Sequence, residues 1–378
     1  GLSGSGIDVE SMVKVGMMTK QSEYDKMYKK EIKDEWTKSA YADVYSSLNT
    51  FTNTTMSNYK MQSVMNAMSA SSNDSTVVTA TANGAAASMS HSVTVKSTSS
   101  NAYLLTGTGQ TIKRSVEGGT TSTSTKLSDV AFYSITDAGT TDSSGNKQYT
   151  VKYSESDKGV TVSASDTALS LKLTDSTDSS ADSYTLSYTY EDLMNGKTLN
   201  DLATDIGSKD TNLQANYDAT NDAFSIYNKN GGGANIIGIT VQNGTESGSS
   251  ATTSAATKTL FDNLHLSVYS DGKLSSTTES YTVGTANTDA KGTYGDVLID
   301  GKEYSKLSSN KLTVSGVTYT FAGKSTSTTS GTTTTYGSST VSVSQNTDAI
   351  VSTVKQFVTD YNKMLDSLND KIYETKYS

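Results

Sequence analysis

The sequence contains no cysteine and no proline, and both absences limit what the protein can be. Without cysteine there is no disulfide framework, no thiolate zinc site and no cysteine nucleophile. At average usage a chain of this length would carry roughly 19 prolines. A chain without disulfides or X-Pro bonds needs no oxidation and has no slow proline isomerisation step in folding. Both absences suit a protein that is transported unfolded and refolds quickly.

Histidine and net positive charge are also scarce, which argues against several kinds of function. The two histidines, His91 and His265, lie in or beside strand-like runs, so we interpret both as structural. Two histidines provide little basis for a histidine-based catalytic triad or a multi-histidine metal centre. The formal net charge of −9 argues against a nucleic-acid partner. No nucleophile elbow, zinc-protease helix or phosphate-binding loop motif occurs. We therefore predict no enzymatic activity, no cofactor and no metal.

Three weaker signals have a plainer interpretation. The acidic cluster Asp175, Asp178 and Asp182 lacks the glycine and distal glutamate of an EF-hand, so we predict a solvated loop. The run Gly231–Gly233 lacks the lysine of a phosphate cradle, and we predict a turn. No segment approaches the roughly 20 apolar residues of a membrane span, and no signal-peptide pattern opens the sequence. We expect neither membrane insertion nor a cleaved signal.

Both ends of the sequence have helical periodicity. From Ile7 to about Ala70, bulky residues recur every three or four positions, which predicts a long amphipathic helix. Near the other end a second stripe begins just after Thr347 and Asp348, which are plausible N-cap residues. We predict that the two helices pack into a stalk through Tyr24, Met27, Tyr28, Ile32, Trp36, Val44, Leu48, Ile350, Val354, Phe357, Tyr361 and Leu368.

The middle of the sequence has the alternation of half-buried strands. The alternating runs lie around Val93, Leu171, Leu213, Phe224 and Val317. Asp300-Gly301 and Ser315-Gly316 are typical of tight hairpin turns between such runs. One short helix is predicted at Leu199–Ile206, with Thr198 as its N-cap and Asp201 three residues later.

These patterns predict a multidomain α+β fold in which a helical stalk carries inserted antiparallel β-rich head domains. Residues 1–72 would form the N-terminal leg and residues 346–378 the C-terminal helix of the leg. A first head domain would comprise 73–115 and 250–345, with a second, 116–249, inserted in it. The two internal boundaries rest on composition shifts alone.

Several segments resemble one protein family. They include the opening GLSGSGIDVESMV, the helix Tyr41–Tyr45, the strand Val78–Ala82, and the run Leu199–Ala203 that leads to Leu213–Tyr217 and Phe224–Ile226. The later segments are Val297–Gly301, Val314–Thr318, Asn346–Ile350 and Phe357–Asn362. In this order they are similar to the flagellar filament cap proteins, also called the flagellar hook-associated protein 2 family.

The resemblance implies a function. Such a protein would leave the cell through the flagellar type III pathway without a cleaved signal and form a homo-oligomeric ring at the extracellular tip of the flagellum. There it would retain flagellin monomers and promote their folding and insertion. Its partners would be further copies of itself and flagellin, with hook–filament junction proteins and an export chaperone as further candidates. From the motif alone, Gly4, Gly6, Ile7 and Asp8 would seat the leg on the filament. The alternative is a surface adhesin whose Ser/Thr/Tyr-rich head binds host glycans or mucin.

Overall fold

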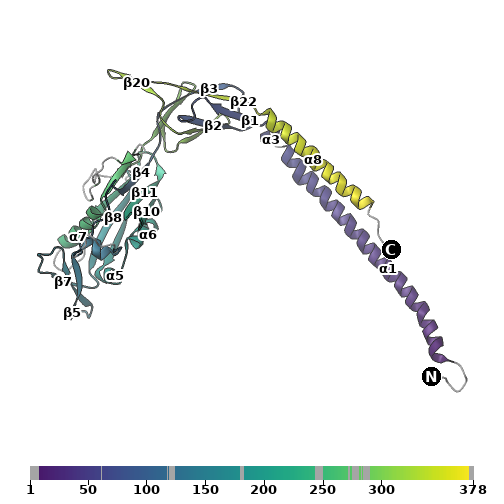
Figure 1. The fold of residues 1–378 in the computed structure, drawn as a ribbon, viewed down its shortest axis with the longest axis horizontal. Helices are drawn as coiled ribbons and strands as arrows, with labels where there is room; N and C mark the ends of the chain where they lie inside the picture. The colour runs from purple at the N-terminus through teal and green to yellow at the C-terminus, as the bar shows by residue number, and fades with distance from the viewer. Residues whose placement is uncertain are drawn as a thin grey trace.

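The computed structural model describes residues 8–60, 62–116, 118, 124–178, 183–242, 250–270, 273–274, 281, 283 and 290–373. The molecule is long and bent, with a two-helix leg at one end, a β-rich module next to it and a second β-rich module beyond (Figure 1). We call these the leg, the proximal module and the distal module. The predicted α+β fold, with terminal helices around antiparallel sheets, is confirmed.

The leg contains four helical segments from the N-terminal part of the chain and one from the C-terminal part. They are α1 (Val9–Thr50), the π turn η1 (Phe51–Thr55), α2 (Met56–Tyr59), α3 (Gln62–Met65) and α8 (Thr347–Ile372). The helix predicted to reach about Ala70 ends earlier, because β1 (Met68–Ser72) pairs with a strand of the proximal module. The predicted N-cap residues of the last helix, Thr347 and Asp348, lie one and two residues after the observed N-cap. The cap is Asn346, whose side chain accepts a hydrogen bond from the Ala349 N–H at 2.9 Å.

The proximal module is built on two antiparallel sheets and one separate hairpin. The larger sheet has the order β1-β22-β3-β16-β17, the smaller β18-β19-β2, and β20-β21 form the hairpin. The strands are β2 (Val78–Ala82), β3 (Ser90–Ser97), β16 (Gly295–Ile299), β17 (Lys302–Leu307), β18 (Lys311–Val314), β19 (Val317–Phe321), β20 (Ser327–Ser330), β21 (Thr333–Tyr336) and β22 (Ser339–Gln345). Alternate residues such as Val93, Val341 and Tyr319 are buried, and they form the core of this module.

Both predicted hairpin turns are confirmed. Asp300-Gly301 connects β16 to β17 and Ser315-Gly316 connects β18 to β19, and all four residues have the positive φ that such turns require. The Asp300 carboxylate also lies 2.7 Å from the Nδ1 atom of the nearly buried His91 and accepts the Ser92 N–H at 2.9 Å. His91 therefore fastens the first turn to β3.

The distal module has three antiparallel sheets with the orders β10-β11-β4-β13-β14, β15-β12-β8-β9 and β5-β6-β7. The strands are β4 (Asn101–Thr106), β5 (Ser134–Thr141), β6 (Lys147–Lys152), β7 (Val160–Ser163), β8 (Thr167–Ser176), β9 (Ser183–Thr189), β10 (Leu213–Asp218), β11 (Ala223–Gly231), β12 (Asn235–Val241), β13 (Leu266–Ser270), β14 (Lys273–Leu274) and β15 (Ala290–Lys291). The helices are α4 (Leu127–Ala131), α5 (Tyr190–Met194), α6 (Leu199–Lys209) and α7 (Ser250–Asn263).

The short helix predicted from residue 199 is confirmed as α6. Thr198 and Asp201 form a reciprocal capping box, in which the Thr198 hydroxyl accepts the Asp201 N–H and the Asp201 carboxylate accepts the Thr198 N–H. Its buried face, Leu199, Leu202, Ala203 and Ile206, packs into the core of the distal module. The helix runs one turn farther than predicted, to Lys209.

Strand pairing divides the head at different positions from those suggested by composition. β4 pairs with β11 and β13, so the chain enters the distal module near residue 101 rather than 116. α7, β13 and β15 pack on or pair with distal strands, so the chain leaves near residue 291 rather than 249. The two cores follow this division, since one runs from Ala102 to Ala290 and the other lies on both sides of it. We propose 101–291 as the inserted unit.

A fragment of residues 98–294 tests this division. Because its hydrophobic core draws on no residue of the proximal module, we expect the fragment to fold alone and unfold in one cooperative transition, measured by circular dichroism during urea titration. The two segments in which the chain passes between the modules lie side by side, because Ser100 pairs with Thr293. A short glycine linker in place of 101–292 should therefore leave the remaining chain folded. A fragment without a cooperative transition contradicts the division.

Candidate functional site

The upper part of the leg is held together by an aromatic cluster. The Phe51 side chain, 8% exposed, lies with its ring centroid 6.5 Å from that of Phe357 and 6.1 Å from that of Tyr361. Tyr59 meets Phe357 edge to face at 5.4 Å. Aromatic pairs at these separations contribute about 0.5–1.5 kcal/mol beyond the area they bury. The cluster, which we call the leg aromatic cluster, joins the first helical chain segment to α8.

The π turn explains how two residues eight positions apart both reach Phe357. In a regular α-helix Phe51 and Tyr59 would lie about 80° apart around the axis. Within η1, however, the Met56 N–H bonds to the Phe51 carbonyl, an i to i−5 hydrogen bond that widens the turn. The wider turn reduces the rotation per residue and brings Tyr59 to the face of Phe51. This is why helical periodicity in the sequence did not identify Tyr59.

Polar contacts reinforce the leg aromatic cluster. The Tyr59 hydroxyl donates to Asp360 at 2.6 Å. Hydrogen bonds from Tyr59 and from Gln356 hold the pKa of Asp360 below its ordinary value of 3.8, and the same bond to Asp360 raises the pKa of Tyr59. Farther down the leg, Lys371 of α8 lies 3.5 Å from Asp43 of α1. These two links place α8 beside the last two turns of α1 and the short helical segments that follow it.

The Tyr59–Asp360 hydrogen bond leads to a pH-dependent prediction. A carboxyl group whose pKa is lower in the folded state contributes stability above its unfolded pKa, and this contribution is lost as the pH falls through the folded-state value. Tyr59→Phe should therefore speed amide hydrogen exchange in α8 at pH 6. The difference from the unmodified protein should shrink as the pH falls below 3.8, the ordinary value for Asp360, and disappear once the pH is below the lower pKa of the folded state. The matched control is Tyr361→Phe, which should change exchange little at either pH. An effect of Tyr59→Phe that is equal at both pH values contradicts the assignment.

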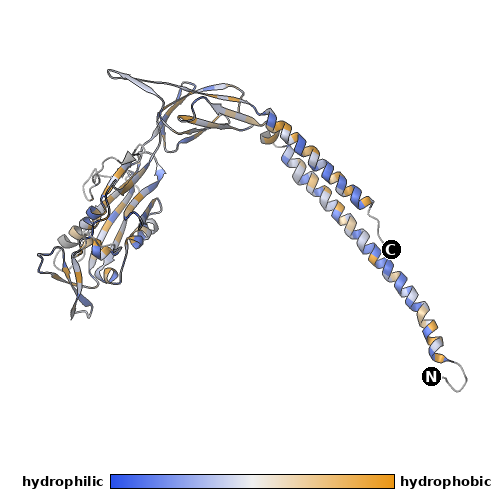
Figure 2. Ribbon diagram, in the orientation of Figure 1, coloured by the Kyte–Doolittle hydropathy of each residue, from blue (hydrophilic) through white to orange (hydrophobic). Residues whose placement is uncertain are grey.

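The predicted stalk-packing residues fall into two groups. The first group lies in the part of the leg where α8 runs beside the end of α1 and the short segments η1, α2 and α3 (Figure 2). It comprises Val44, Leu48, Ile350, Val354, Phe357, Tyr361 and Leu368. The second group precedes Asp43, the residue level with the end of α8. It comprises Ile32, Tyr28, Met27 and Tyr24, which lie 11 to 19 positions before Asp43, and Trp36, which lies 7 positions before it. In the single chain the side chains of Tyr24, Met27, Tyr28 and Trp36 are between 52% and 68% exposed. The packing role of both groups stays a prediction.

The proposed filament-seating motif lies at the start of α1. Gly4, Gly6 and Ile7 are outside the described residues. Asp8 is the N-cap of α1, and its carboxylate accepts hydrogen bonds from both the backbone N–H and the hydroxyl of Ser11. These bonds lower the pKa of Asp8. Asp8 therefore determines where the leg helix begins, and its contact with a filament stays a prediction.

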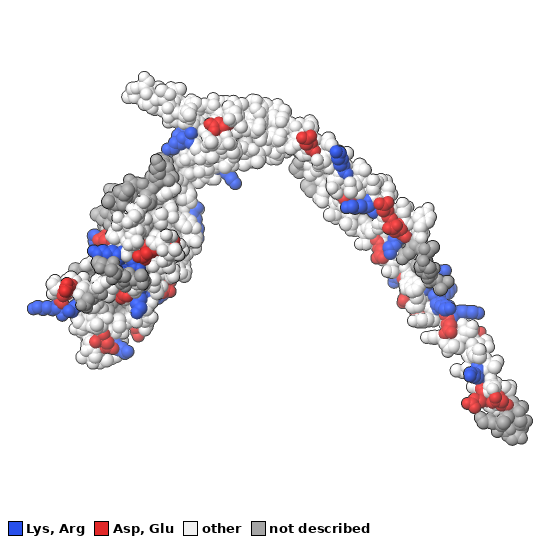
Figure 3. All heavy atoms as spheres, viewed as in Figure 1, with Lys and Arg blue, Asp and Glu red and all other residues white. Residues whose placement is uncertain are grey.

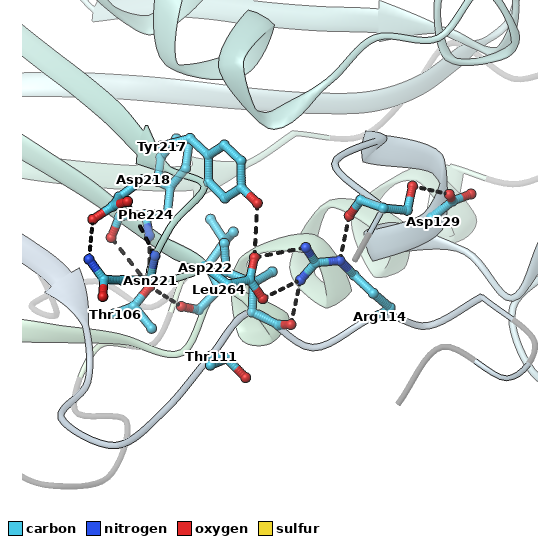
Figure 4. Close-up of polar contacts among 12 residues, drawn as sticks. Thr106, Thr111, Arg114, Asp129, Tyr217, Asp218, Asn221, Asp222, Phe224 and Leu264 are labelled. Atoms are coloured by element: carbon cyan, nitrogen blue, oxygen red, sulfur yellow. Dashed lines mark hydrogen bonds and ion pairs between the residues drawn. The ribbon is translucent and has the colours of Figure 1, made fainter. Parts of the chain in front are cut away.

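A buried charged cluster lies in the distal module (Figure 4). Arg114, whose side chain is 1% exposed, donates to both carboxylate oxygens of Asp222, at 3.0 and 2.8 Å. It also donates to the carbonyls of Ile112 and Ser124, and Asp222 accepts the Tyr217 hydroxyl at 3.0 Å. A guanidinium so enclosed is closed to a substrate, and the cluster fastens the segment after β4 to the turn before β11.

Among the described residues there is no group of three or more potential metal ligands of the His, Asp or Glu type. Two members of the acidic cluster noted in the sequence are described. Asp175 is nearly buried at the end of β8, where its side chain accepts a hydrogen bond from Asn212, while Asp178 follows the strand. The predicted solvated loop is therefore wrong for Asp175. The turn predicted at Gly231–Gly233 lies between β11 and β12 and begins one residue later, because Gly231 is the last residue of β11. Gly232 has a φ of +99°.

The fold and the leg define a class of protein: a multidomain α+β protein in which paired terminal helices carry nested antiparallel β modules. None of the described helices is both long and apolar enough to cross a bilayer. Two family models match the chain, the flagellar hook-associated protein 2 N-terminus over residues 5–102 and the corresponding C-terminus over residues 292–378. The chain belongs to the flagellar hook-associated protein 2 family.

Solved structures with similarity to the chain include several flagellar cap proteins. The D1-D2-D3 domains of the Escherichia coli protein FliD are 17% identical, with a TM-score of 0.49 over 88% of this chain and 72% of that one. The Pseudomonas aeruginosa protein is 12% identical, with a TM-score of 0.36 over 80% of this chain and 99% of that one. The Bdellovibrio bacteriovorus protein is 11% identical, with a TM-score of 0.31 over 72% and 98%. A comparison with curated proteins found no match.

Proposed function

We propose that the protein caps the distal end of the bacterial flagellar filament, outside the cell, as a ring of identical subunits that retains flagellin and promotes its folding and insertion. The observation that carries this proposal is family membership, because the two family models cover both the leg with its adjoining strands and the C-terminal part of the proximal module. The role is structural, and the family is not a family of enzymes.

The shape of the molecule supports different roles for the leg and for the two modules. In α1, residues before Asp43 extend past the end of α8 and expose tyrosine and methionine side chains, which suits contact with other subunits or with the filament end. The two β-rich modules lie at the other end of the molecule, away from the tip of the leg (Figure 1). We propose that the leg seats on the filament, with Gly4, Gly6, Ile7 and Asp8 at its end, and that the modules form the plate above it.

The proposed partners are further copies of the chain and flagellin. Hook–filament junction proteins, an export chaperone and export by the flagellar type III pathway remain predictions from the family resemblance. Of the two functions that the sequence left open, the comparisons support the cap, and none of them supports the adhesin.

Complementation tests the proposal. The gene for the whole protein would be expressed in its own host after deletion of the chromosomal copy, and filaments and flagellin in the medium would be counted. We expect filaments to be absent in the deletion strain, with flagellin monomer in the medium, and both effects to be reversed by complementation. Normal filaments in the deletion strain contradict the proposed function.

A further inference from the structure

The hairpin formed by β20 and β21 lacks the packing that usually stabilises such an element. Among the described strands each pairs only with the other, and all their residues are exposed except Tyr336, which is half-buried. Its base is fixed where the Gly337 N–H donates to the Thr326 carbonyl and the Ser325 N–H to the Val95 carbonyl. In Figure 1 this hairpin, which we call the arm, extends beyond the body of the proximal module. An isolated two-stranded hairpin is marginally stable in water, so a surface that covers it would stabilise it.

A groove large enough to receive such an element lies where the two modules meet. Its volume is about 1010 Å³, and residues of both modules line it, including Ser100, Asn101, Asn216 and Gly323. Three tyrosines, Tyr103, Tyr227 and Tyr269, stand side by side on its distal wall, because Tyr103 of β4 is in register with the other two across β11 and β13. The Tyr103 ring lies 6.3 Å from that of Tyr227 and 5.3 Å from that of Tyr269. We call this the tyrosine groove.

Charge favours a second copy of the chain as the occupant. With a net charge of −9, two copies repel each other, and they meet at least cost through surfaces that carry no charge. The segment from Ser327 to Tyr336 contains no charged residue, and Lys324 is the one charged residue among those that line the tyrosine groove. Figure 3 shows the projecting arm free of coloured atoms, whereas the leg carries both signs along its length.

We propose that the β20–β21 hairpin of one copy lies face to face on the tyrosine groove of the next copy. The inference rests on the proposed ring and names the surfaces that build it. Three adjacent strands span about 10 Å, which is wide enough for a ribbon of two strands to stack on them as one sheet stacks on another. Threonine hydroxyls of the arm, such as Thr334, would meet tyrosine rings and the side chain of Asn216. Because arm and groove are different surfaces, the contact is heterologous and can close into a ring.

Photo-crosslinking tests the proposed contact directly. The full chain would carry a benzophenone amino acid in place of Thr334, and a mixture of ¹⁵N-labelled and unlabelled copies would be irradiated under conditions in which the protein assembles. We expect adducts between labelled and unlabelled copies, mapped by mass spectrometry to peptides that contain Tyr103, Tyr227 or Tyr269. The matched control replaces Thr161, an exposed threonine of the edge strand β7, and should give at least tenfold fewer adducts with these peptides.

A charge placed in the groove gives an independent measurement. Tyr103→Glu should weaken self-association at least tenfold in analytical ultracentrifugation, while Tyr45→Glu on the exposed face of α1 should leave it unchanged. Assembly that proceeds without adducts in the tyrosine groove contradicts the inference and leaves the proposed function in place. A chain that caps filaments in the complementation assay but gives adducts elsewhere on the surface contradicts it equally. A protein that stays monomeric at every concentration contradicts both the contact and ring assembly in solution.

Discussion

Replacing Arg114 by methionine should lower the free energy of unfolding of the distal module by about 3–5 kcal/mol, because it removes one partner of a buried ion pair. The Arg114 side chain is 1% exposed and donates to Asp222, Ile112 and Ser124, so the change leaves several acceptors without a donor. The measurement is urea unfolding followed by circular dichroism, and we expect hydrogen exchange in the segment after β4 to rise as well.

Two variants control for the effect of Arg114→Met. Lys113→Met changes the neighbouring exposed lysine in the same way and should alter the unfolding free energy by less than about 0.5 kcal/mol. The double variant Arg114→Met with Asp222→Asn should recover part of the loss, because no unpaired charge then remains and asparagine tolerates the positive φ of residue 222. If Arg114→Met costs no more than Lys113→Met, the cluster does not hold the module together.

Replacing Phe51 by alanine should detach α8 from the first part of the leg. Phe51 is the one buried residue of the leg segments α1, η1, α2 and α8 as described, and removal of a buried phenylalanine ring costs about 3–5 kcal/mol. Because the contacts of Phe51 with Phe357 and Tyr361 are in the leg, we expect amide exchange in α8 to accelerate, while the unfolding of the two modules stays unchanged.

The functional counterpart of Phe51→Ala is measured in the complementation strain, where we expect fewer and shorter filaments. Tyr45→Ala, which truncates an aromatic side chain that is 73% exposed on α1, serves as the matched control and should leave both exchange and filament length unchanged. Phe51→Leu, which keeps an apolar side chain in the cluster, should recover most of the lost protection. Unchanged exchange in α8 of the alanine variant contradicts the role given to the leg aromatic cluster.

The elements that follow from local physical chemistry could be predicted from the sequence. The α6 helix begins at its capping box, and the Asp300-Gly301 and Ser315-Gly316 turns have residues that tolerate a positive φ. The alternation around Val93 and Val317 identified strands because one face of each is buried. In each case neighbouring residues supply the whole signal.

The elements that depend on distant partners could not be predicted in this way. Nothing near β4 indicates that its partners are β11 and β13, more than a hundred residues away, so composition alone does not lead to the boundary that we propose near residue 101. Arg114 was not singled out, because its carboxylate partner lies 108 positions farther along the chain. Tyr59 was not predicted to pack in the leg, because the prediction used a constant helical period and the π turn at Phe51–Thr55 changes that period.

The junction between leg and proximal module also has a consequence for how the protein bears a pull. β1 and β22 are antiparallel neighbours, and both connect to the leg at the same end of the sheet, where β1 follows α3 and β22 leads into α8. When the module is held and the leg is drawn away from it, both strands are under tension in the same direction, so the load is divided between two covalent chains. The ladder between β1 and β22 then carries little shear, and the junction resists extension better than a single tether would.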